Sequence, residues 1–406
     1  MSVLHKEHKK FDAIVCLSAI DWDFLWQRTQ EVMSQFAAMG YPVLFIENTG
    51  VRVPGLRDIP RIRHRIKKLF QKKDYKKQEQ YVNIEMLSPF ALPFPYSPIA
   101  VQLNAAMLRK KILRFSSEKK IPVNRILLWS YMTTPLAVKL ADMLPWAGVV
   151  VDLVSDPCKV KGAADIVVSH KKMLESADII YCASVPVVNS AKKYILEAQY
   201  HKVQLFEDGF STRLYNMASH ECEEINFPRK DTGGPLVAYI GGVNDKIWWD
   251  AVSTMARKLP EITFLYVGPK DVSDLPCEGV GKNVFWSPSF KEYCQLGLFL
   301  DKCSAGLIPY TPNPYVAEMR PAKINEYLVM GLPIVATKLP EIERFANENG
   351  PGIIYLAETA DDFPTALEKA LDEDCEEYRN KRWEIARSRS WETICKGLEL
   401  HLQGLM

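Results

Sequence analysis

Short continuous runs of apolar, often β-branched residues alternate with longer stretches of helical periodicity along most of the chain. Such runs are typical of strands buried on both faces of a parallel sheet, with helices as the crossovers. The pattern therefore predicts an α/β fold with doubly wound sheets. In the first half, the expected strands are Ala13–Ser18, Pro42–Glu47, Asn83–Leu87, Ile126–Trp129, Val149–Leu153 and Ile179–Cys182, and the clearest helices are Trp26–Met39 and Ile99–Lys119.

The alternation stops between His220 and Pro235, where the composition turns polar and shows no apolar period. This composition is typical of a loop, so we expect the linker between two domains there. Beyond the linker the alternation restarts and predicts a second sheet. Its expected strands are Leu236–Ile240, Thr263–Val267, Asn283–Trp286, Ala305–Pro309, Ile334–Ala336 and Ile353–Leu356, with helices at Ala251–Lys258, Phe290–Leu300 and Lys323–Met330 and a final helical segment at Phe363–His401.

Size and composition agree with two globular domains. The 406 residues exceed what one hydrophobic core usually supports, and 48% hydrophobic with 25% charged residues excludes a disordered or fibrous chain. The nine cysteines show no Cys-x-x-Cys spacing and no cluster with histidine, so we expect no metal site and a reducing, cytoplasmic location. We also recognise no leader peptide and no apolar run long enough to span a bilayer.

Basic residues are concentrated in Arg57–Lys77, where ten lysines and arginines accompany two acidic residues. Ile62, Ile66, Leu69 and Phe70 recur among them at helical spacing, which predicts an amphipathic basic helix. Helices of this kind bind anionic membrane surfaces, so we expect peripheral association with the inner face of the plasma membrane. The alternative is a solvated charged loop. Nucleic acid is not an expected partner, because no aromatic stacking platform accompanies the run.

The segment that begins at Glu318 carries the most specific chemistry. Its residues predict a loop, a helix that starts near Lys323, a glycine stop and a return to the sheet. Glu318, Lys323 and Glu326 then face the crevice beyond the strand ends, where open α/β sheets bind ligands. Arg320, Lys323 and the helix start suit a diphosphate. Glu326 is able to accept hydrogen bonds from the two hydroxyls of a ribose.

Two glutamates separated by seven residues, then a helix and Gly-x-Pro-x-Val-Ala, resemble the motif of glycosyltransferases with two Rossmann-like domains, the GT-B type. The first half also resembles bacterial transferases that build surface polysaccharides. Together the similar stretches run from about Ala13 to Trp391. Besides the glutamate motif they are Asp21–Arg28, Gly40–Glu47, Glu175–Tyr181, Phe206–Phe210, Ala238–Gly242 and Leu265–Pro269.

This resemblance implies an architecture and an activity. We expect two Rossmann-like domains that face a central cleft, with acceptor binding in residues 1–220, a linker at 221–235, nucleotide-sugar binding in 236–375 and a helix at 376–406 that packs back on the first domain. The implied reaction moves a sugar from a nucleotide-diphosphate donor to a polysaccharide or lipid-linked acceptor, such as a polyprenyl-diphosphate glycan, in bacterial surface glycan synthesis. It uses neither a metal nor a cofactor.

The resemblance also assigns roles to residues. Glu326 is expected to bind the ribose of the donor, and Glu318 to face the donor sugar. Many members carry an arginine and a lysine after the second-domain glycines, whereas this chain has only Lys246, so Arg320 and Lys323 are expected to neutralise more of the phosphate charge. The expected donor-binding set is Gly241, Gly242, Lys246, Gly268, Pro269, Ser287, Arg320, Lys323 and Glu326.

An inverting transfer needs a general base on the acceptor, which we expect at the carboxyl end of a first-domain strand. Four aspartates fit that position, and each is equally suited to capping a helix or ending a strand. A retaining transfer needs no such base, and both stereochemical courses stay open. The catalytic candidates are therefore Glu318, Asp21, Asp23, Asp152 and Asp156.

Two other functions are compatible with the architecture. A sugar-nucleotide epimerase would need a set of histidines and carboxylates around the donor, and the chain has only seven histidines. The transferase family often has a histidine in the stretch that corresponds to Trp129–Pro135, and its absence there is a departure from the family pattern. A non-catalytic scaffold that binds nucleotide sugars or carbohydrates would have no need to retain Glu318, Lys323 and Glu326 together. The sequence therefore favours a transferase.

Overall fold

The computed structural model describes residues 10–23, 26–50, 83–89, 91–92, 94–159, 164–211, 214, 227–228, 233–270, 282–290, 293–314 and 316–405. The chain divides into two compact units. The first unit comprises Met1–Glu207 and Cys395–Met406, and the second comprises Asp208–Ile394. The predicted basic helix at Arg57–Lys77 lies outside the described residues.

The first unit contains a seven-stranded sheet with the order β3-β2-β1-β4-β5-β6-β7, in which all neighbouring strands are parallel. The chain order reverses between β1 and β4, the switch point at which open α/β sheets bind ligands. All six predicted strands are present, and β7 is an additional short edge strand. The strands are β1 (Ala13–Leu17), β2 (Val43–Ile46), β3 (Ile84–Leu87), β4 (Ile126–Ser130), β5 (Gly148–Leu153), β6 (Ile179–Cys182) and β7 (Val203–Leu205).

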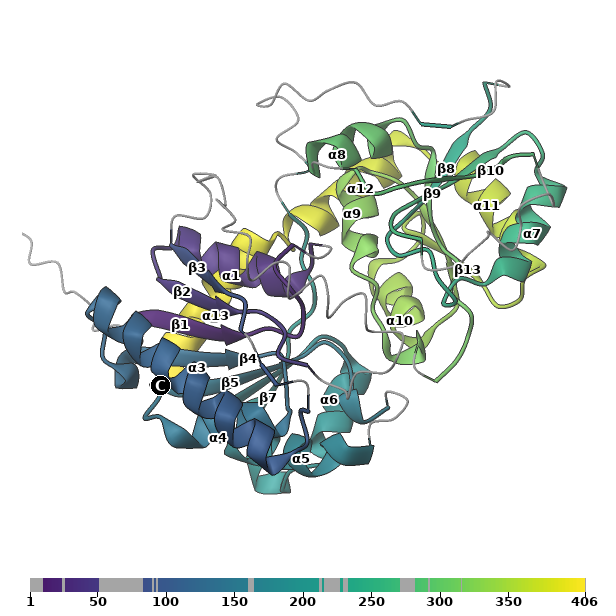
Figure 1. The fold of residues 1–406 in the computed structure, drawn as a ribbon. Coiled ribbons are helices and arrows are strands. Elements are labelled where there is room, and N and C mark those ends of the chain that lie inside the picture. Colours follow the sequence, from purple (N-terminus) through teal and green to yellow (C-terminus); the bar gives the residue numbers. More distant parts are fainter. Residues whose placement is uncertain are drawn as a thin grey trace, which may run out of the picture. The chain divides into compact units, whose positions relative to one another are not determined.

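Helices cover both faces of this sheet, as Figure 1 shows. Alternate residues of a strand point to opposite faces, so Val15 contributes to the core under α3 and α4 while Cys16 is buried on the other side. On that second side, Phe36 of α1 packs against Trp129 of β4 with ring centroids 5.6 Å apart. The helices are α1 (Arg28–Ala38), α3 (Pro98–Lys119), α4 (Pro135–Met143), α5 (Val167–Ser176), α6 (Val185–Lys192) and α13 (Trp391–Leu405), with short 3-10 turns η3 (Val123–Arg125), η4 (Pro157–Lys159), η5 (Ala164–Ile166) and η6 (Glu197–Lys202).

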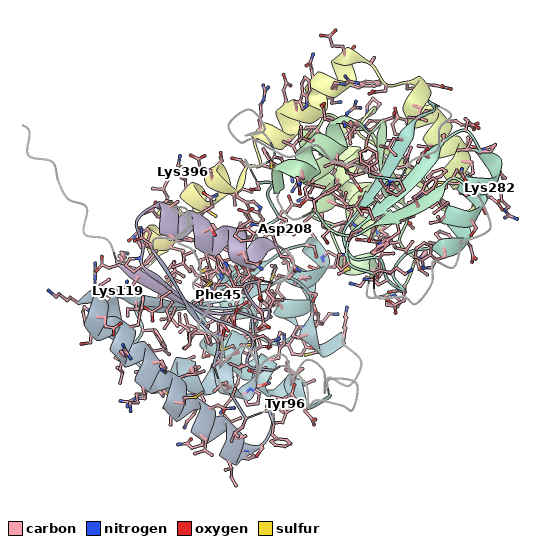
Figure 2. All side chains as sticks on the ribbon, turned by 45° about the horizontal axis from the view of Figure 1, so that its top comes forward. Phe45, Tyr96, Lys119, Asp208, Lys282 and Lys396 are labelled. Carbon is pink, nitrogen blue, oxygen red and sulfur yellow. The ribbon has the colours of Figure 1, made fainter. Side chains whose placement is uncertain are left out.

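Local signals in the sequence fix the ends of the longest helix, α3. Ser97 caps its start, because the serine side chain accepts a hydrogen bond from the backbone of Ala100, and Pro98 occupies the first helical position. Lys120 ends the helix in the left-handed conformation, with φ of 57°. Figure 2 shows Lys119 at this end of α3 and Phe45 inside the unit.

The second unit contains a six-stranded sheet with the order β10-β9-β8-β11-β12-β13, again with all neighbours parallel. This is the Rossmann order, and its switch point lies between β8 and β11. The strands are β8 (Leu236–Ile240), β9 (Thr263–Val267), β10 (Val284–Ser287), β11 (Ala305–Ile308), β12 (Ile334–Thr337) and β13 (Ile354–Ala357). The helices are α7 (Trp249–Lys258), α8 (Tyr293–Asp301), η9 (Val316–Glu318), α9 (Lys323–Val329), α10 (Pro340–Asn349), α11 (Asp362–Asp372) and α12 (Glu376–Arg387).

The predicted final helical segment Phe363–His401 is three helices rather than one: α11, α12 and α13. The first break is held by Arg382, a buried residue of α12 whose guanidinium donates to Asp374 in the loop after α11. The same guanidinium donates to the backbone oxygen of Gly331 at 2.7 Å. Continuous apolar periodicity in the sequence does not reveal such a buried polar contact.

The chain passes between the two units at Glu207/Asp208 and again at Ile394/Cys395, whereas the expected limits were 220, 235 and 375. The two passages lie side by side, because Phe210 N donates to Arg389 O at 3.1 Å and Trp391 N donates to Phe210 O at 3.0 Å. Gly209 makes this approach possible, since a Cβ there would lie 2.7 Å from the carbonyl oxygen of Arg389.

The end of α13 belongs to the first unit, which confirms the predicted helix that packs back on the first domain. Glu399 accepts a hydrogen bond from the hydroxyl of Tyr41 at 2.5 Å. One helical turn separates Glu399 from Gln403, whose amide reaches the same hydroxyl at 3.1 Å, and His401 Nδ1 lies 2.9 Å from the Tyr181 hydroxyl. In the part of the chain described, no helix is both long and apolar enough to cross a membrane.

Candidate functional site

Two glycine turns follow adjacent strands at the carboxyl edge of the second sheet. Gly241 follows β8 with φ of +120°, and Gly268 follows β9 with φ of +151°, both in the region that favours glycine. A Cβ on Gly268 would lie only 1.9 Å from the backbone oxygen of Gly241. The two turns therefore pack backbone against backbone, and a side chain at Gly268 would overlap the Gly241 turn.

Replacement of Gly268 by alanine is expected to lower the free energy of unfolding by at least about 3 kcal/mol, because strain at positive φ adds to the overlap with Gly241 O. Urea unfolding followed by tryptophan fluorescence measures this change. Gly397→Ala is the control: Gly397 lies in α13 with no atom near its missing Cβ, so alanine should stabilise by roughly 0.5–1 kcal/mol. Equal unfolding midpoints for the two variants would contradict the packing argument.

Lys323 opens α9 beside the first glycine turn and between two tyrosines. Its ammonium nitrogen lies 3.7 Å from the ring centroid of Tyr239 and 5.0 Å from that of Tyr310. A Cβ added to Gly241 would lie 3.3 Å from the same nitrogen. The side chain is 8% exposed, so the charge is held at the switch point between β8 and β11 with little water around it.

This burial perturbs the protonation of the cluster. Loss of water lowers the pKa of the Lys323 ammonium, and the nearby Tyr310 hydroxyl and Glu326 carboxylate only partly counter the effect. Burial by itself raises the pKa of Tyr310. The charge and hydrogen bond of Lys323, the hydrogen bond with Tyr239 and the charge of Lys246 together outweigh burial and lower this pKa. A buried ammonium without a full counter-charge favours the arrival of an anion.

Tyr327 fixes the helix that carries Lys323. Its buried hydroxyl donates to the backbone oxygens of Ala238 in β8, at 3.0 Å, and Leu307 in β11, at 3.2 Å, and accepts from Ile240 N at 3.1 Å. The ring lies against Gly306, where a Cβ would come within 2.4 Å of it. The first turn of α9 is therefore held rigidly over the switch point.

The other predicted donor-binding residues lie around this centre. Lys246 is close enough for its charge to lower the pKa of both Lys323 and Tyr310. Arg320 is buried, its guanidinium lies 4.7 Å from the ring centroid of Phe345, and it donates to Asn325 at 3.4 Å. The remaining members are the half-buried Gly242 and Glu326, the exposed Pro269, the buried Ser287 at the end of β10, and Glu318 in η9.

The structure thus brings Gly241, Gly268 and Lys323 together and places Lys246 close to them. The roles assigned to these residues remain predictions. Tyr239 and Tyr310 are not among the predicted site residues, although their rings lie on either side of Lys323. Their position directly at the carboxyl ends of β8 and β11 is the signal that would have found them.

Among the candidate bases in the first unit, Asp152 is the most buried, with 1% of its surface exposed. Its Oδ1 accepts from Arg28 Nε at 2.9 Å and lies 2.9 Å from Arg28 Nη2 in an ion pair, and its Oδ2 accepts from Trp129 Nε1 at 3.3 Å. Arg28 in turn donates to Phe206 O at 2.7 Å and stacks on the Phe206 ring. These contacts give Asp152 the environment of a structural ion pair.

The other three candidates are arranged differently. Asp21 is half-buried and Asp23 exposed in the loop after β1, the switch-point strand of the first sheet. Glu47 holds this loop, since its buried carboxylate accepts from Trp22 N at 2.9 Å. Asp156 follows β5 and is 3% exposed, with its Oδ1 accepting from Cys158 N at 2.9 Å. The loop after β1 therefore offers the accessible carboxylates.

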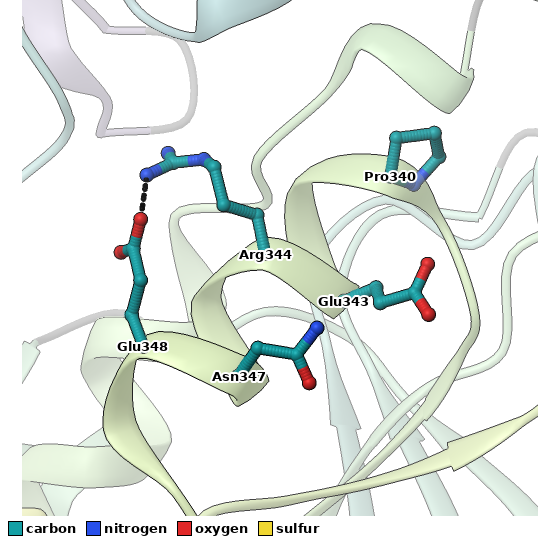
Figure 3. A pocket seen from close by; sticks show the side chains of 5 residues that line it. All are labelled: Pro340, Glu343, Arg344, Asn347 and Glu348. Atoms are coloured by element: carbon teal, nitrogen blue, oxygen red, sulfur yellow. Dashed lines mark hydrogen bonds and ion pairs between the residues drawn. The ribbon is translucent and has the colours of Figure 1, made fainter.

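A shallow hollow lies over α10, the helix whose Phe345 ring contacts Arg320. Figure 3 shows its lining, in which Arg344 donates to Glu348 at 2.7 Å along the helix. Pro340, Glu343 and Asn347 complete the lining. None of the predicted site residues lines it, so the candidate site is the edge between β8 and β11.

Comparison with known proteins gives one sequence relative. TuaH of Bacillus subtilis strain 168, named as a glycosyltransferase of teichuronic acid biosynthesis, is 26% identical over 231 residues. The match spans 55% of this chain and 56% of TuaH, so it covers little more than half of either protein. A scan against models of protein families finds no match.

Solved structures resemble nearly the whole chain. Sucrose-phosphate synthase from Thermosynechococcus elongatus matches 97% of this chain and 99% of its own, with a TM-score of 0.67 and 13% identity. Anabaena HepE in complex with UDP-glucose matches 97% of this chain and 99% of its own, with a TM-score of 0.63 and 13% identity. The chain is thus similar in sequence to a bacterial glycosyltransferase and has the GT-B fold of two Rossmann-like domains, which confirms the predicted fold.

Proposed function

We propose that the chain is a glycosyltransferase that moves a sugar from a nucleotide-diphosphate donor to a polysaccharide or lipid-linked acceptor, without a metal. The observation that carries this proposal is the buried ammonium of Lys323, held against Tyr239 and beside the Gly241 turn at the switch point of the second sheet. An anion is the natural ligand of such a site, and the glycines of the two turns would let a diphosphate approach the backbone.

The chemistry follows from charge. Departure of the nucleoside diphosphate builds negative charge on its oxygens, and a fixed positive group in a dry site stabilises that charge most strongly. Lys323 supplies it, with Arg320 and Lys246 near the same edge. The diphosphate would also raise the lowered pKa of Lys323, because an opposite charge favours the ammonium form.

The donor is proposed to be a uridine diphosphate sugar. HepE, with a similar fold, is described in complex with UDP-glucose, which supports the nucleotide without identifying the sugar. Glu326 lies one helical turn beyond Lys323 on α9, and its carboxylate is proposed to accept hydrogen bonds from the ribose hydroxyls. Glu318, which lies in η9, is proposed to face the sugar.

The acceptor is proposed to be a glycan of the bacterial surface, linked to a polyprenyl diphosphate or already polymeric. The support is the similarity to TuaH, whose name places it in teichuronic acid biosynthesis. Attachment to the inner face of the plasma membrane through Arg57–Lys77 is part of the same proposal. Co-sedimentation with vesicles of anionic lipid tests it, and equal recovery in the supernatant with and without those vesicles would refute it.

Incubation of the protein with UDP-glucose and other UDP-sugars is expected to release UDP. The variant Glu326→Gln is expected to bind UDP roughly 10- to 100-fold more weakly, because charge-assisted hydrogen bonds to the ribose are lost. Calorimetric titration with UDP and 2′-deoxy-UDP measures this. The variant should no longer distinguish the two nucleotides.

The control for this variant is Glu377→Gln, an exposed glutamate in the first turn of α12, which should bind UDP as the parent does. Failure of every nucleotide sugar to bind would refute the proposed function. Binding of UDP-sugars without turnover on any glycan would instead favour a carbohydrate-binding scaffold. The same turnover assay on Asp21→Asn and Asp23→Asn tests whether the general base lies in the loop after β1. If both variants remain active, neither aspartate is the base.

A further inference from the structure

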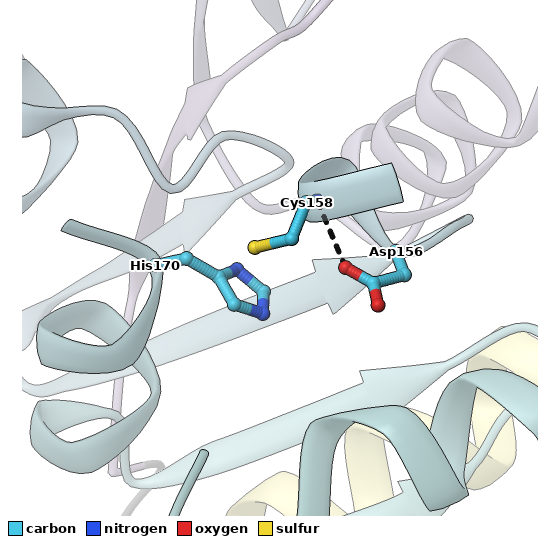
Figure 4. A group of neighbouring side chains, drawn as sticks. All are labelled: Asp156, Cys158 and His170. Carbon is cyan, nitrogen blue, oxygen red and sulfur yellow. Dashed lines mark hydrogen bonds between the residues drawn. The ribbon is translucent and has the colours of Figure 1, made fainter. Parts of the chain in front are cut away.

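Three side chains with metal-binding groups meet at one end of the first sheet. Asp156 and Cys158 lie in the segment after β5, and His170 lies on α5. One carboxylate oxygen, the thiol sulfur and one ring nitrogen all lie within 4.8 Å of one another. Figure 4 shows the three side chains converging from these two segments.

The set has the composition of a zinc site. Carboxylate oxygen, thiolate sulfur and imidazole nitrogen are the three ligand types that Zn²⁺ takes in proteins. One carboxylate and one thiolate balance the charge of the ion, and the imidazole adds a neutral ligand. We propose that Asp156, Cys158 and His170 bind a zinc ion, with a fourth position left for water.

Surrounding groups orient two of the ligands. His170 Nδ1 lies 3.0 Å from the hydroxyl of Thr133, a buried residue before α4, and a ring nitrogen held in this way leaves the other for a metal. Asp156 accepts from the Ser190 hydroxyl of α6 through Oδ2 and from the Cys158 backbone through Oδ1. Partners of this kind around the ligands are typical of metal sites.

The three side chains are buried enough to hold a zinc ion and still open enough for the ion to enter from solvent. His170 is 1% exposed and Asp156 3%, which shields an ion from competing water, while Cys158 is only partly buried and gives a route from solvent.

The spacing requires a small closure. In a tetrahedral site, zinc bonds of about 2.0–2.3 Å set neighbouring ligand atoms roughly 3.5 Å apart. Movement of about 1 Å brings atoms that lie within 4.8 Å to that separation. Cys158 is the natural group to move, because it lies in the short turn η4 (Pro157–Lys159) rather than in a long helix.

The ion would join the segment after β5 to α5 and, through Ser190, to α6. Its role is to fix this end of the first unit, because no predicted donor-binding residue belongs to the cluster. Asp156 is one of the four candidate bases, and as a zinc ligand it would not serve as the base. This inference is independent of the proposed function, and sugar transfer is not routed through the zinc. The expectation of no metal site rested on cysteine and histidine spacing, whereas the fold brings together residues that the spacing keeps apart.

Zinc binding is tested on the full chain after removal of metals with a chelator and dialysis. Calorimetric titration with zinc chloride is expected to show about one equivalent bound, and the thermal unfolding midpoint should rise with zinc. Cobalt(II) chloride should produce thiolate-to-cobalt charge-transfer absorption together with the visible bands of a tetrahedral ion.

Variants locate the site. Cys158→Ser and His170→Gln should lose tight zinc binding, whereas Cys375→Ser, at an exposed cysteine before α12, should bind as the parent does. Thr133→Val removes only the partner of the His170 ring and should weaken binding roughly 10- to 100-fold. The melting profile in chelator shows whether each variant is folded.

The cobalt spectrum of the unmodified chain tests for metal binding through a thiolate even if a variant does not fold. Absence of the charge-transfer band, or zinc affinity equal in the parent and a folded Cys158→Ser variant, overturns the proposal and leaves a hydrogen-bonded cluster without metal. The band together with its loss in Cys158→Ser supports the site.

Discussion

Lys323→Met should reduce the rate of sugar transfer roughly 100- to 1,000-fold, the usual loss when one group that stabilises developing charge is removed. Methionine keeps most of the side-chain volume against the rings of Tyr239 and Tyr310 but removes the ammonium. Unfolding should not become easier, because the variant no longer buries a charge whose pKa is already lowered. Initial rates of UDP release and urea unfolding measure the two effects.

Lys282→Gln is the matched control, since Lys282 is exposed on the surface of the second unit, where Figure 2 labels it. This variant should transfer sugar at the parental rate. A Lys323→Met protein that is folded and retains full activity would show that the diphosphate is neutralised elsewhere, with Arg320 and Lys246 as the next residues to test. Loss of activity together with loss of folding would show that Lys323 is structural.

Asp152→Asn should lower the free energy of unfolding by about 3–5 kcal/mol, because it leaves the guanidinium of Arg28 buried opposite a neutral group. The two side chains are 3% and 0% exposed, so water cannot replace the lost charge. Chemical unfolding measures the change. Activity per folded molecule should persist, since the contacts of Asp152 are those of a structural carboxylate.

The Arg125–Asp12 ion pair is the control, because it has a similar length to the Arg28–Asp152 pair but is much more exposed. Its atoms are 2.8 Å apart, a similar distance, but its side chains are 32% and 39% exposed. Asp12→Asn should therefore cost only about 0–1 kcal/mol. If Asp152→Asn is as stable as Asp12→Asn, the ion pair is not important for the fold. If Asp152→Asn is stable but inactive, Asp152 is the general base among the four candidate aspartates.

The strands were the most predictable part of the molecule. A strand buried on both faces, such as β8 at Leu236–Ile240, needs a continuous apolar run, and that run is visible in the sequence. The edge strand β7 was missed because only the first of its three residues is buried, so it leaves no such run. The ends of helices were less certain: α1 begins at Arg28, two residues after the predicted start at Trp26.

The candidate site was predictable only in part. The order of motifs placed Lys323 and the glycines at one sheet edge, because parallel strands end there together. The ion pair of Arg28 with Asp152 joins residues 124 positions apart, and no local pattern relates them. The same holds for His170, which reaches Cys158 only through the packing of α5 against the strand that precedes the cysteine. Contacts of this kind depend on the fold and cannot be read from spacing.

The last helix has a consequence for how the protein is made. Tyr41 and Tyr181 lie in the first unit but find their hydroxyl partners on α13, more than two hundred residues later in the chain. A ribosome therefore finishes the second unit before it releases the piece that completes the first. The N-terminal half must wait, partly assembled, through most of translation, and a fragment that stops at Glu207 would remain in that unfinished state.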